Sequence, residues 1–109
     1  MILINHSGKK LKIDARKMGF FMRGLGLMFR SRNSDNLLFD FSRDVKISFH
    51  SLFVFFPFII IWLDSSNRVI EWRVVRPFSL TISPKRKFRR VVEVPLNEKN
   101  ECIVRFFKK

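Results

Sequence analysis

The sequence has one cysteine, no tyrosine and few acidic residues. Because Cys102 is the only cysteine among 109 residues, no internal disulfide can form and no oxidising compartment is implied. The 14 phenylalanines carry no polar group, so we expect them to serve packing first. Nine Asp and Glu against 22 Lys and Arg give a net charge of +13, which favours contact with polyanions such as nucleic acid or an acidic membrane surface.

The longest apolar run is too short to cross a bilayer. Leu52 to Leu63 is twelve residues without a charge, whereas a membrane-spanning helix needs about 20. Pro57 interrupts the run and removes a backbone donor. Since Val, Ile and Phe dominate, we expect two buried β segments that meet at Pro57. The first ten residues also lack the basic start and apolar centre of a signal peptide, so we expect a cytoplasmic protein that is not transmembrane.

Turn-forming residues divide the rest of the chain into short segments. The cluster from Asn5 to Gly8 predicts an N-terminal hairpin. Asp14 and the apolar spacing after it predict a short helix from about Ala15 to Arg23. Further strands are expected at Leu37–Phe41, Phe58–Leu63, Val69–Val75, Val91–Val94 and Cys102–Phe106, with Val69–Val75 antiparallel to Phe58–Leu63. Residues 1–109 therefore predict one mainly β domain, a small closed β-barrel or sandwich-like domain with one short helix near the N-terminus.

A set of motifs occurs in a fixed order along the chain. They are Arg23-Gly24-Leu25-Gly26-Leu27-Met28-Phe29-Arg30, Leu38-Phe39-Asp40-Phe41, Pro57, the apolar segment ending at Asp64, and Val91-Val92-Glu93-Val94. In these motifs the chain resembles the domain-of-unknown-function family 192, also called uncharacterised protein family 0127. The resemblance implies a small, mostly β barrel-like domain without an established activity. Where that family carries a Lys, an Asn and an Asp near the proline, this chain has Leu52, Phe53 and Ile59, so a polar site there would be replaced by hydrocarbon.

The residue types that most often bind metals or carry catalysis are scattered. His6, His50 and Cys102 share no ligand-like spacing, which argues against a zinc site, and no nucleophile lies at a recognisable spacing from a base. We therefore expect no metal, no cofactor and no catalytic residue. The protein is interpreted as a non-enzymatic binding or interaction module with an unknown ligand and partner, and an enzyme with an unrecognised site stays an alternative.

Glu93 stands out because its strand is otherwise apolar. Its side chain either faces solvent or is buried with a cation, since an unpaired buried carboxylate costs several kcal/mol. We expect it to pair with Arg23 or Arg30, chiefly as structure. These three residues are also the candidate ligand-binding set.

Two basic segments predict a polyanion-binding surface. The first contains Lys85, Arg86, Lys87, Arg89 and Arg90, and the second contains Lys9, Lys10 and Lys12, followed by Arg16 and Lys17. On one face, these side chains would meet phosphates without reading sequence, which makes nucleic acid the alternative partner. A solvated loop is the competing explanation of the first segment, because Phe88 alone is a poor stacking platform.

Overall fold

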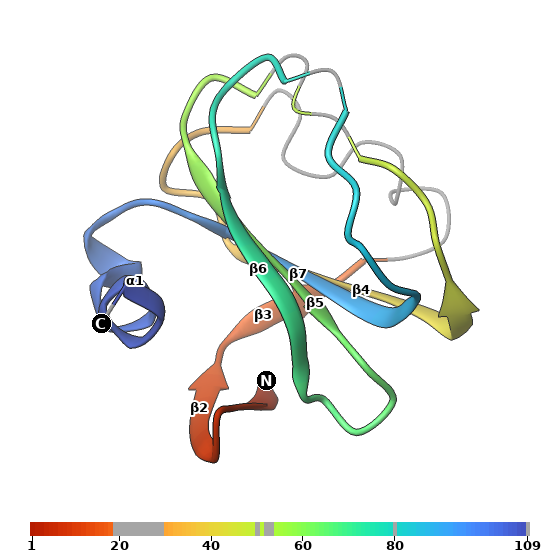
Figure 1. The fold of residues 1–109 in the computed structure, drawn as a ribbon. Helices are drawn as coiled ribbons and strands as arrows, with labels where there is room; N and C mark the ends of the chain where they lie inside the picture. Colours follow the sequence, from red (N-terminus) through yellow and green to blue (C-terminus); the bar gives the residue numbers. More distant parts are fainter. Residues whose placement is uncertain (19–29, 50, 52–53, 80, 109) are drawn as a thin grey trace.

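The computed structural model describes residues 1–18, 30–49, 51, 54–79 and 81–108, and their strands form two sheets (Figure 1). A two-stranded sheet is the hairpin of β1 (Ile2–His6) and β2 (Lys9–Ile13). The central sheet has five strands in the order β3-β4-β7-β5-β6. These strands are β3 (Ala15–Lys17), β4 (Asn36–Val45), β5 (Phe58–Leu63), β6 (Val69–Val75) and β7 (Phe88–Pro95). A 3-10 turn, η2 (Glu98–Asn100), and a helix, α1 (Glu101–Lys108), follow.

Strand β5 is buried along its whole length because the central sheet is covered on both faces. Successive side chains of a strand point to opposite faces. Phe58, Ile60 and Trp62 accordingly pack in one hydrophobic cluster, the first core, while the residues between them pack in another, the second core. The unbroken apolar run therefore reflects a strand that supplies two cores.

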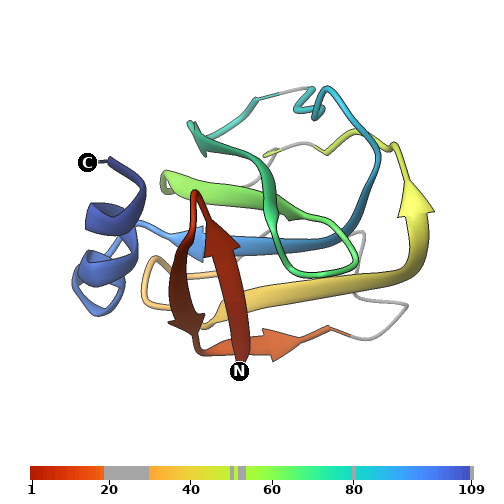
Figure 2. The same cartoon turned by 60° about the horizontal axis from the view of Figure 1, so that its bottom comes forward.

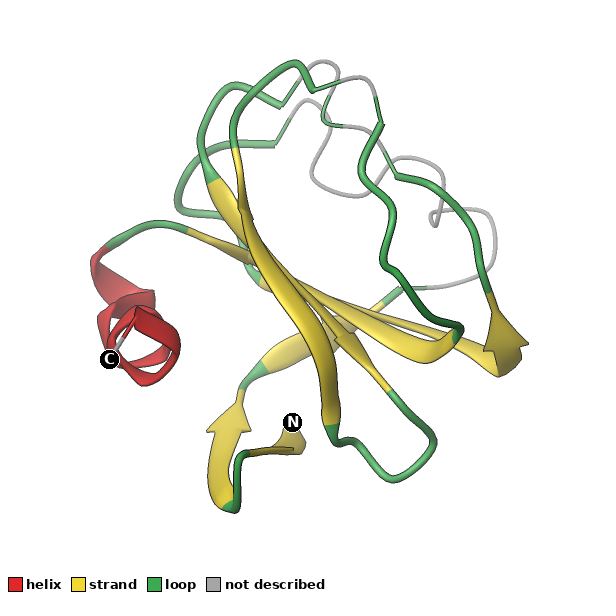
Figure 3. Cartoon of the chain, viewed as in Figure 1, coloured by secondary structure: helices red, strands yellow, loops and turns green. Residues whose placement is uncertain are grey.

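The two faces of the central sheet are covered by different kinds of structure. Loops cover the first core, to which they contribute Val54, Phe56 and Ile82, and Figure 3 shows these loops arching over the sheet. The β1–β2 hairpin and α1 cover the second core, where Ile4 and Phe107 are buried. Figure 2 shows the hairpin lying across the strands with α1 beside it. The described part of the chain is thus mainly β, as predicted. The prediction of a closed barrel was wrong, because the edge strands β3 and β6 do not pair with each other.

The predicted N-terminal helix was wrong where the structure describes it. Ala15–Lys17 is strand β3, which pairs parallel to β4 with Ala15 opposite Asn36. The rest of the predicted segment, from residue 19 onward, lies outside the described residues. The pairing with β4 joins residues 21 positions apart, which local spacing cannot reveal.

The predicted strand Cys102–Phe106 was also wrong, because this segment belongs to helix α1. Asn97 caps the preceding turn by accepting a hydrogen bond from the Asn100 N–H at 3.1 Å. Ile103 and Phe107, four residues apart, are then buried against the second core, as one face of a helix requires. Before and at Pro57, residues 54–57 form no strand, and residues 52 and 53 lie outside the described residues. The second predicted half of the apolar run is strand β5.

Other predicted elements are confirmed. The N-terminal hairpin closes through Ser7 and Gly8, whose φ angles are 54° and 80°, as in the two-residue turns that suit the strand twist. Strands β5 and β6 pair antiparallel as predicted. The strands predicted around Leu37–Phe41 and Val91–Val94 are parts of β4 and β7.

Candidate functional site

The first basic segment begins with three exposed cations, which we call the basic turn: Lys85, Arg86 and Lys87. Pro84 before the turn and Phe88 after it are both buried. Apolar contacts therefore anchor the backbone on either side. The intervening side chains extend into solvent.

Two residues of β6 hold the basic turn in place. Glu71 accepts a hydrogen bond from the Lys85 N–H at 3.0 Å and forms a salt bridge with Arg73, which donates to the Ser83 carbonyl at 2.9 Å. Burial raises the pKa of Glu71, but the hydrogen bonds from Lys85 and Arg73 lower it more, so that the net pKa lies below the ordinary 4.5. Glu71 is therefore ionised at neutral pH and fixes the turn's backbone.

The last two cations of the segment stabilise the sheet. Arg89 forms a salt bridge with Asp44, with 3.2 Å between Nε and Oδ1. Arg90 donates from Nε to Asp40 at 3.0 Å and from its guanidinium to the Asn67 side chain at 2.9 Å. Burial raises the pKa of Asp40, while the Ser42 N–H and Arg90 lower it by more, for a net decrease. These contacts are structural, so Arg89 and Arg90 contribute less than the basic turn to any free positive surface.

Phe88 is not available as a stacking ring. It is 0% exposed in the first core. The Phe41 and Phe49 rings lie 5.7 and 5.8 Å from it between centroids. The aromatic residue within the basic segment is therefore part of the interior.

Sequence reasoning missed two cations that join the basic turn. Val45 lies opposite Phe88 where β4 pairs with β7, which brings exposed Arg43 and Lys46 to the same end of the sheet. We call this group the basic end: Arg43, Lys46, Lys85, Arg86 and Lys87. Within the part of the chain that the structure describes, none of the five forms a salt bridge.

A signal for this surface was present in the sequence as an absence of acids. No Asp or Glu occurs in residues 45–63 or in residues 72–92. The structure joins these two stretches, since Phe49 and Ile82 exchange backbone hydrogen bonds of 2.8 Å. Two acid-free stretches that pair in space have no carboxylates of their own to repel an anion.

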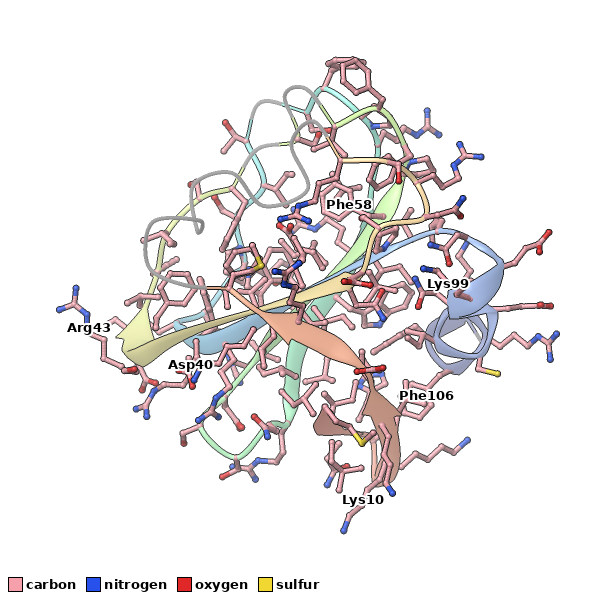
Figure 4. The ribbon with its side chains drawn as sticks, turned by 180° about the vertical axis from the view of Figure 1, so that it is seen from behind. Lys10, Asp40, Arg43, Phe58, Lys99 and Phe106 are labelled. Atoms are coloured by element: carbon pink, nitrogen blue, oxygen red, sulfur yellow. The ribbon has the colours of Figure 1, made fainter. Side chains whose placement is uncertain are left out.

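The second basic segment lies elsewhere. Lys9, Lys10 and Lys12 are exposed on β2, whose hairpin packs on the second core, whereas Ile82 and Phe88 beside the basic turn pack on the first. Figure 4 shows Lys10 and Arg43 extending from different ends of the molecule. The fold therefore places the two basic segments over opposite faces of the central sheet. Arg16 and Lys17 are exposed on β3.

The candidate ligand-binding residues are placed only in part. Glu93 is 5% exposed and lies in β7 between Leu37 of β4 and Ile60 of β5. Its carboxylate therefore faces the first core rather than solvent. Arg30 is half-buried, and Arg23 lies outside the described residues.

A pocket of about 640 Å³ lies where the loop before β4 meets η2. Asn97 donates to the Arg32 carbonyl and Lys99 to the Asn33 carbonyl, both at 2.8 Å. Glu98 also lines it, so charges of both signs surround the space. Of the residues predicted to bind a ligand, none that the structure describes lines this pocket.

The remaining predictions concern metals and the polar positions that the family resemblance highlights. Among the residues that the structure describes, no three His, Cys, Asp or Glu side chains gather in a way that could hold a metal ion. Ile59 is fully buried in the second core, while His50, Leu52 and Phe53 lie outside the described residues. In the described ranges, no helix has the length and apolar character needed to cross a membrane.

Residues 3–105 match the model of the domain-of-unknown-function family DUF192, described as an uncharacterized ACR. The chain belongs to this family. The resemblance read from the ordered motifs is thereby confirmed. Three relatives are described as UPF0127 proteins, the other name of DUF192.

Three relatives of this DUF192 chain come from Pyrococcus and Thermococcus species. One from Pyrococcus furiosus is 34% identical over 81% of this chain and 77% of its own length. One from Pyrococcus horikoshii is 31% identical over 70% of this chain and 66% of its own length. A third, from Thermococcus gammatolerans, is 32% identical over 71% of this chain, and the match spans about half of its length, 51%.

Solved structures share the DUF192 chain's fold. A protein of unknown function from Novosphingobium aromaticivorans superposes with a TM-score of 0.76 at 15% identity, over 98% of this chain and 77% of its own. A protein from Sinorhizobium meliloti, described as a candidate transcription regulator, superposes with a TM-score of 0.73 at 21% identity, over 85% and 76% of the two chains. At these identities the likeness shows the fold alone.

Proposed function

We propose that this member of an uncharacterised family is a non-enzymatic binding module that contacts the phosphates of a polyanion through its basic end. The observation that carries the proposal is the gathering of five exposed cations without salt bridges among the described residues. Lysine and arginine side chains neutralise phosphates and release the counterions around them, which gives affinity without sequence reading.

The local acids support this role because they form their salt bridges with cations outside the basic end. Asp44 pairs with Arg89 and Glu71 with Arg73. Each acid that could neutralise the basic end therefore has another cation. The basic turn is also held by the Glu71 hydrogen bond and by its two buried neighbours, so little ordering of the backbone is needed on binding.

The competing explanation is general attraction by a chain with a net charge of +13. A matched pair of variants separates the two. Lys85→Gln, Arg86→Gln and Lys87→Gln together remove three charges from the basic end, and Lys9→Gln, Lys10→Gln and Lys12→Gln remove three from the hairpin. Both variants have the same net charge and change exposed side chains only.

The measurement is the affinity of each variant for a labelled single-stranded oligonucleotide, determined by fluorescence anisotropy over a range of salt concentrations. We expect the basic-turn variant to bind more weakly and to lower the slope of log K against log salt by about 2, because each phosphate contact on a single strand contributes about 0.7. The hairpin variant should keep the parent slope. Equal losses in both variants would show that only the net charge matters.

Glu93 supports a second candidate, a small-molecule site, because a carboxylate that is 5% exposed lies at the centre of the sheet. In this proposal Glu93 acts with Arg30 and Arg23. Native mass spectrometry of protein purified from its own cells should show a bound mass that the Glu93→Gln variant loses. A parent protein that carries no added mass at any purification stage would count against it.

A further inference from the structure

Two phenylalanines project into solvent and touch each other. Phe55 is 60% exposed and Phe78 is 53% exposed. Their rings meet edge to face, with 5.4 Å between centroids and 80° between planes. Phe55 precedes β5 and Phe78 follows β6, so both lie at the end of the sheet opposite the β5–β6 turn. Figure 1 shows the loops before β5 and after β6 at its top. A pair of large apolar side chains exposed to solvent is typical of an interaction surface.

The backbone of Phe78 is held in a conformation that a bulky residue rarely adopts, with a φ of 62°. Ser51, which is 0% exposed, fixes it. The Ser51 carbonyl accepts from the Phe78 N–H at 2.9 Å, the Ser51 hydroxyl accepts from the Ser79 N–H at 2.6 Å, and the same hydroxyl donates to the Arg76 carbonyl at 2.7 Å. Strain of this kind persists where the surroundings determine the position of a functional side chain.

Between the phenylalanine pair and the basic end, the described residues 48, 49 and 51 form hydrogen bonds with residues 79, 82 and 83. We call these paired residues the ribbon. Phe49 and Ile82 bond through their backbones, and the Ser48 and Ser83 hydroxyls lie 2.6 Å apart. From Phe78 to Lys85 the ribbon extends at most about 23 Å at about 3.3 Å per residue. At about 3.4 Å or more per nucleotide along one strand, that length corresponds to the lower end of the range of about 4–16 nucleotides for single-stranded sites. Its residues belong to the acid-free stretches 45–63 and 72–92, and exposed Arg76 precedes Phe78 by two positions.

We propose that Phe55 and Phe78 are a base-stacking platform and that the polyanion bound at the basic end is a single-stranded nucleic acid lying along this ribbon. The inference rests on the proposed function and deepens it by naming the class of partner. Bases stack on aromatic faces irrespective of sequence, while cations along the groove meet the phosphates.

A membrane is the other surface that accepts exposed phenylalanines beside cations. A bilayer interior has no preferred direction for a ring, so membrane insertion gives no reason to hold Phe78 at a strained φ through a buried serine. Stacking does depend on the orientation of the ring, because the base must lie parallel to its face. The fixed geometry therefore favours a nucleic acid.

The test compares two ligands with the same phosphates. One is an oligothymidylate about 12 nucleotides long, within the range of single-stranded sites, and the other is an abasic strand of equal length. We expect the full chain to bind the oligothymidylate at least about tenfold more tightly, since stacking one base contributes that order of affinity. The ratio should not change with salt, because stacking involves no counterion release.

Variants then test whether the phenylalanine pair causes the difference in affinity between the two strands. Phe55→Ser with Phe78→Asn should bring the ratio close to one while leaving abasic binding unchanged. Leu3→Ser, which removes an apolar side chain 45% exposed on β1, should keep the parent ratio. Because a variant can fail to fold, ultraviolet crosslinking of a 5-iodouracil strand to the parent protein gives an independent readout, with adducts expected on peptides containing Phe55 or Phe78.

The outcomes separate the two proposals. Equal binding of both strands, or crosslinks confined to other peptides, overturns the stacking platform while the polyanion site stands. Binding of neither strand overturns the proposed function itself. A further outcome concerns vesicles of phosphatidylserine and phosphatidylcholine. If the parent protein sediments with these vesicles and only the phenylalanine variant does not, while oligothymidylate binding is unaffected, the pair binds a membrane. This result also overturns the inference.

Discussion

At the scale of single residues, side chains of the same type have very different roles in this chain. The 14 phenylalanines look alike in the sequence, yet Phe88 is fully buried while Phe78 is 53% exposed at a positive φ. Their neighbours in the sequence do not show which of the two is buried, because the hydrogen bonds that fix Phe78 come from Ser51, far along the chain. The burial of Glu93, in contrast, was one of two outcomes that its apolar strand allowed.

The contrast between these phenylalanines gives a prediction about stability. Phe88→Ala should lower the free energy of unfolding by about 3–5 kcal/mol, the usual cost of truncating a buried phenylalanine. Phe78→Asn should change it by less than about 1 kcal/mol, because asparagine tolerates the positive φ and the lost ring was mostly in water. Urea unfolding of both variants is the measurement. A loss for Phe78→Asn as large as that for Phe88→Ala would mean that the exposed ring is part of the core.

At the scale of elements, alternation and turn residues predicted most of the strands, and long-range contacts decided the rest. The Ser7-Gly8 turn and the β5–β6 pairing were readable because their partners are close in sequence. Helix α1 was not, since its β-branched and aromatic residues suggested a strand. The buried Asn100 side chain helps to fix its start by donating to the Pro95 carbonyl at 2.8 Å and accepting from Asn36 at 3.0 Å.

Three carboxylates in or next to the strands hold the sheet through hydrogen bonds, and their ionisation can be tested. Burial raises the pKa of Asp64, but hydrogen bonds from the N–H groups of Arg68 and Ser66 and from the Arg68 side chain lower it by more, for a net decrease below 3.8. The net pKa values of Asp40 and Glu71 are also lowered, from 3.8 and 4.5. A folded pKa below the unfolded one stabilises the fold above the unfolded value, and this stabilisation is lost as the pH falls through the folded value.

We therefore expect the free energy of unfolding to decrease below about pH 4.5, the ordinary value for Glu71. Urea unfolding between pH 7 and pH 2.5 measures this decrease. The combined variant Asp40→Asn, Asp64→Asn and Glu71→Gln should be less stable at neutral pH and should lose less stability on acidification. Asp35→Asn, which changes an exposed carboxylate, serves as the control. If the free energy of unfolding decreased equally in the parent, the combined variant and the Asp35→Asn control, the acid sensitivity would come from other groups.

At the scale of the whole molecule, the sequence indicated burial on both faces of β5 but not how that burial is achieved. A closed barrel and an open sheet with two covers satisfy the same apolar run. The chain adopts the second solution, with the hairpin and α1 over one face and loops over the other. This arrangement also separates the basic turn from the hairpin lysines, which no pattern of charges along the sequence could indicate.

The excess of positive charge should affect the stability of the whole molecule as well as its binding. With a net charge of +13, the folded state brings unpaired cations such as those of the basic end close together, and their repulsion opposes folding. Screening should relieve this repulsion, because the Debye length falls from about 10 Å at 0.1 M salt to about 3 Å at 1 M. We expect the Tm in sodium chloride to rise over this range.

Neutralising the basic turn should have the same effect without salt. The basic-turn variant carries Lys85→Gln, Arg86→Gln and Lys87→Gln together. At low salt its Tm should be higher than that of the parent, and its Tm should rise less when salt is added. A gain in stability together with a loss of oligonucleotide affinity is the pattern expected where charges are kept for binding rather than for folding. Differential scanning calorimetry of the parent and both charge variants at low and high salt measures it. If the basic-turn variant melts at a lower temperature than the parent, these cations stabilise the fold, and the role assigned to the basic end loses its energetic support.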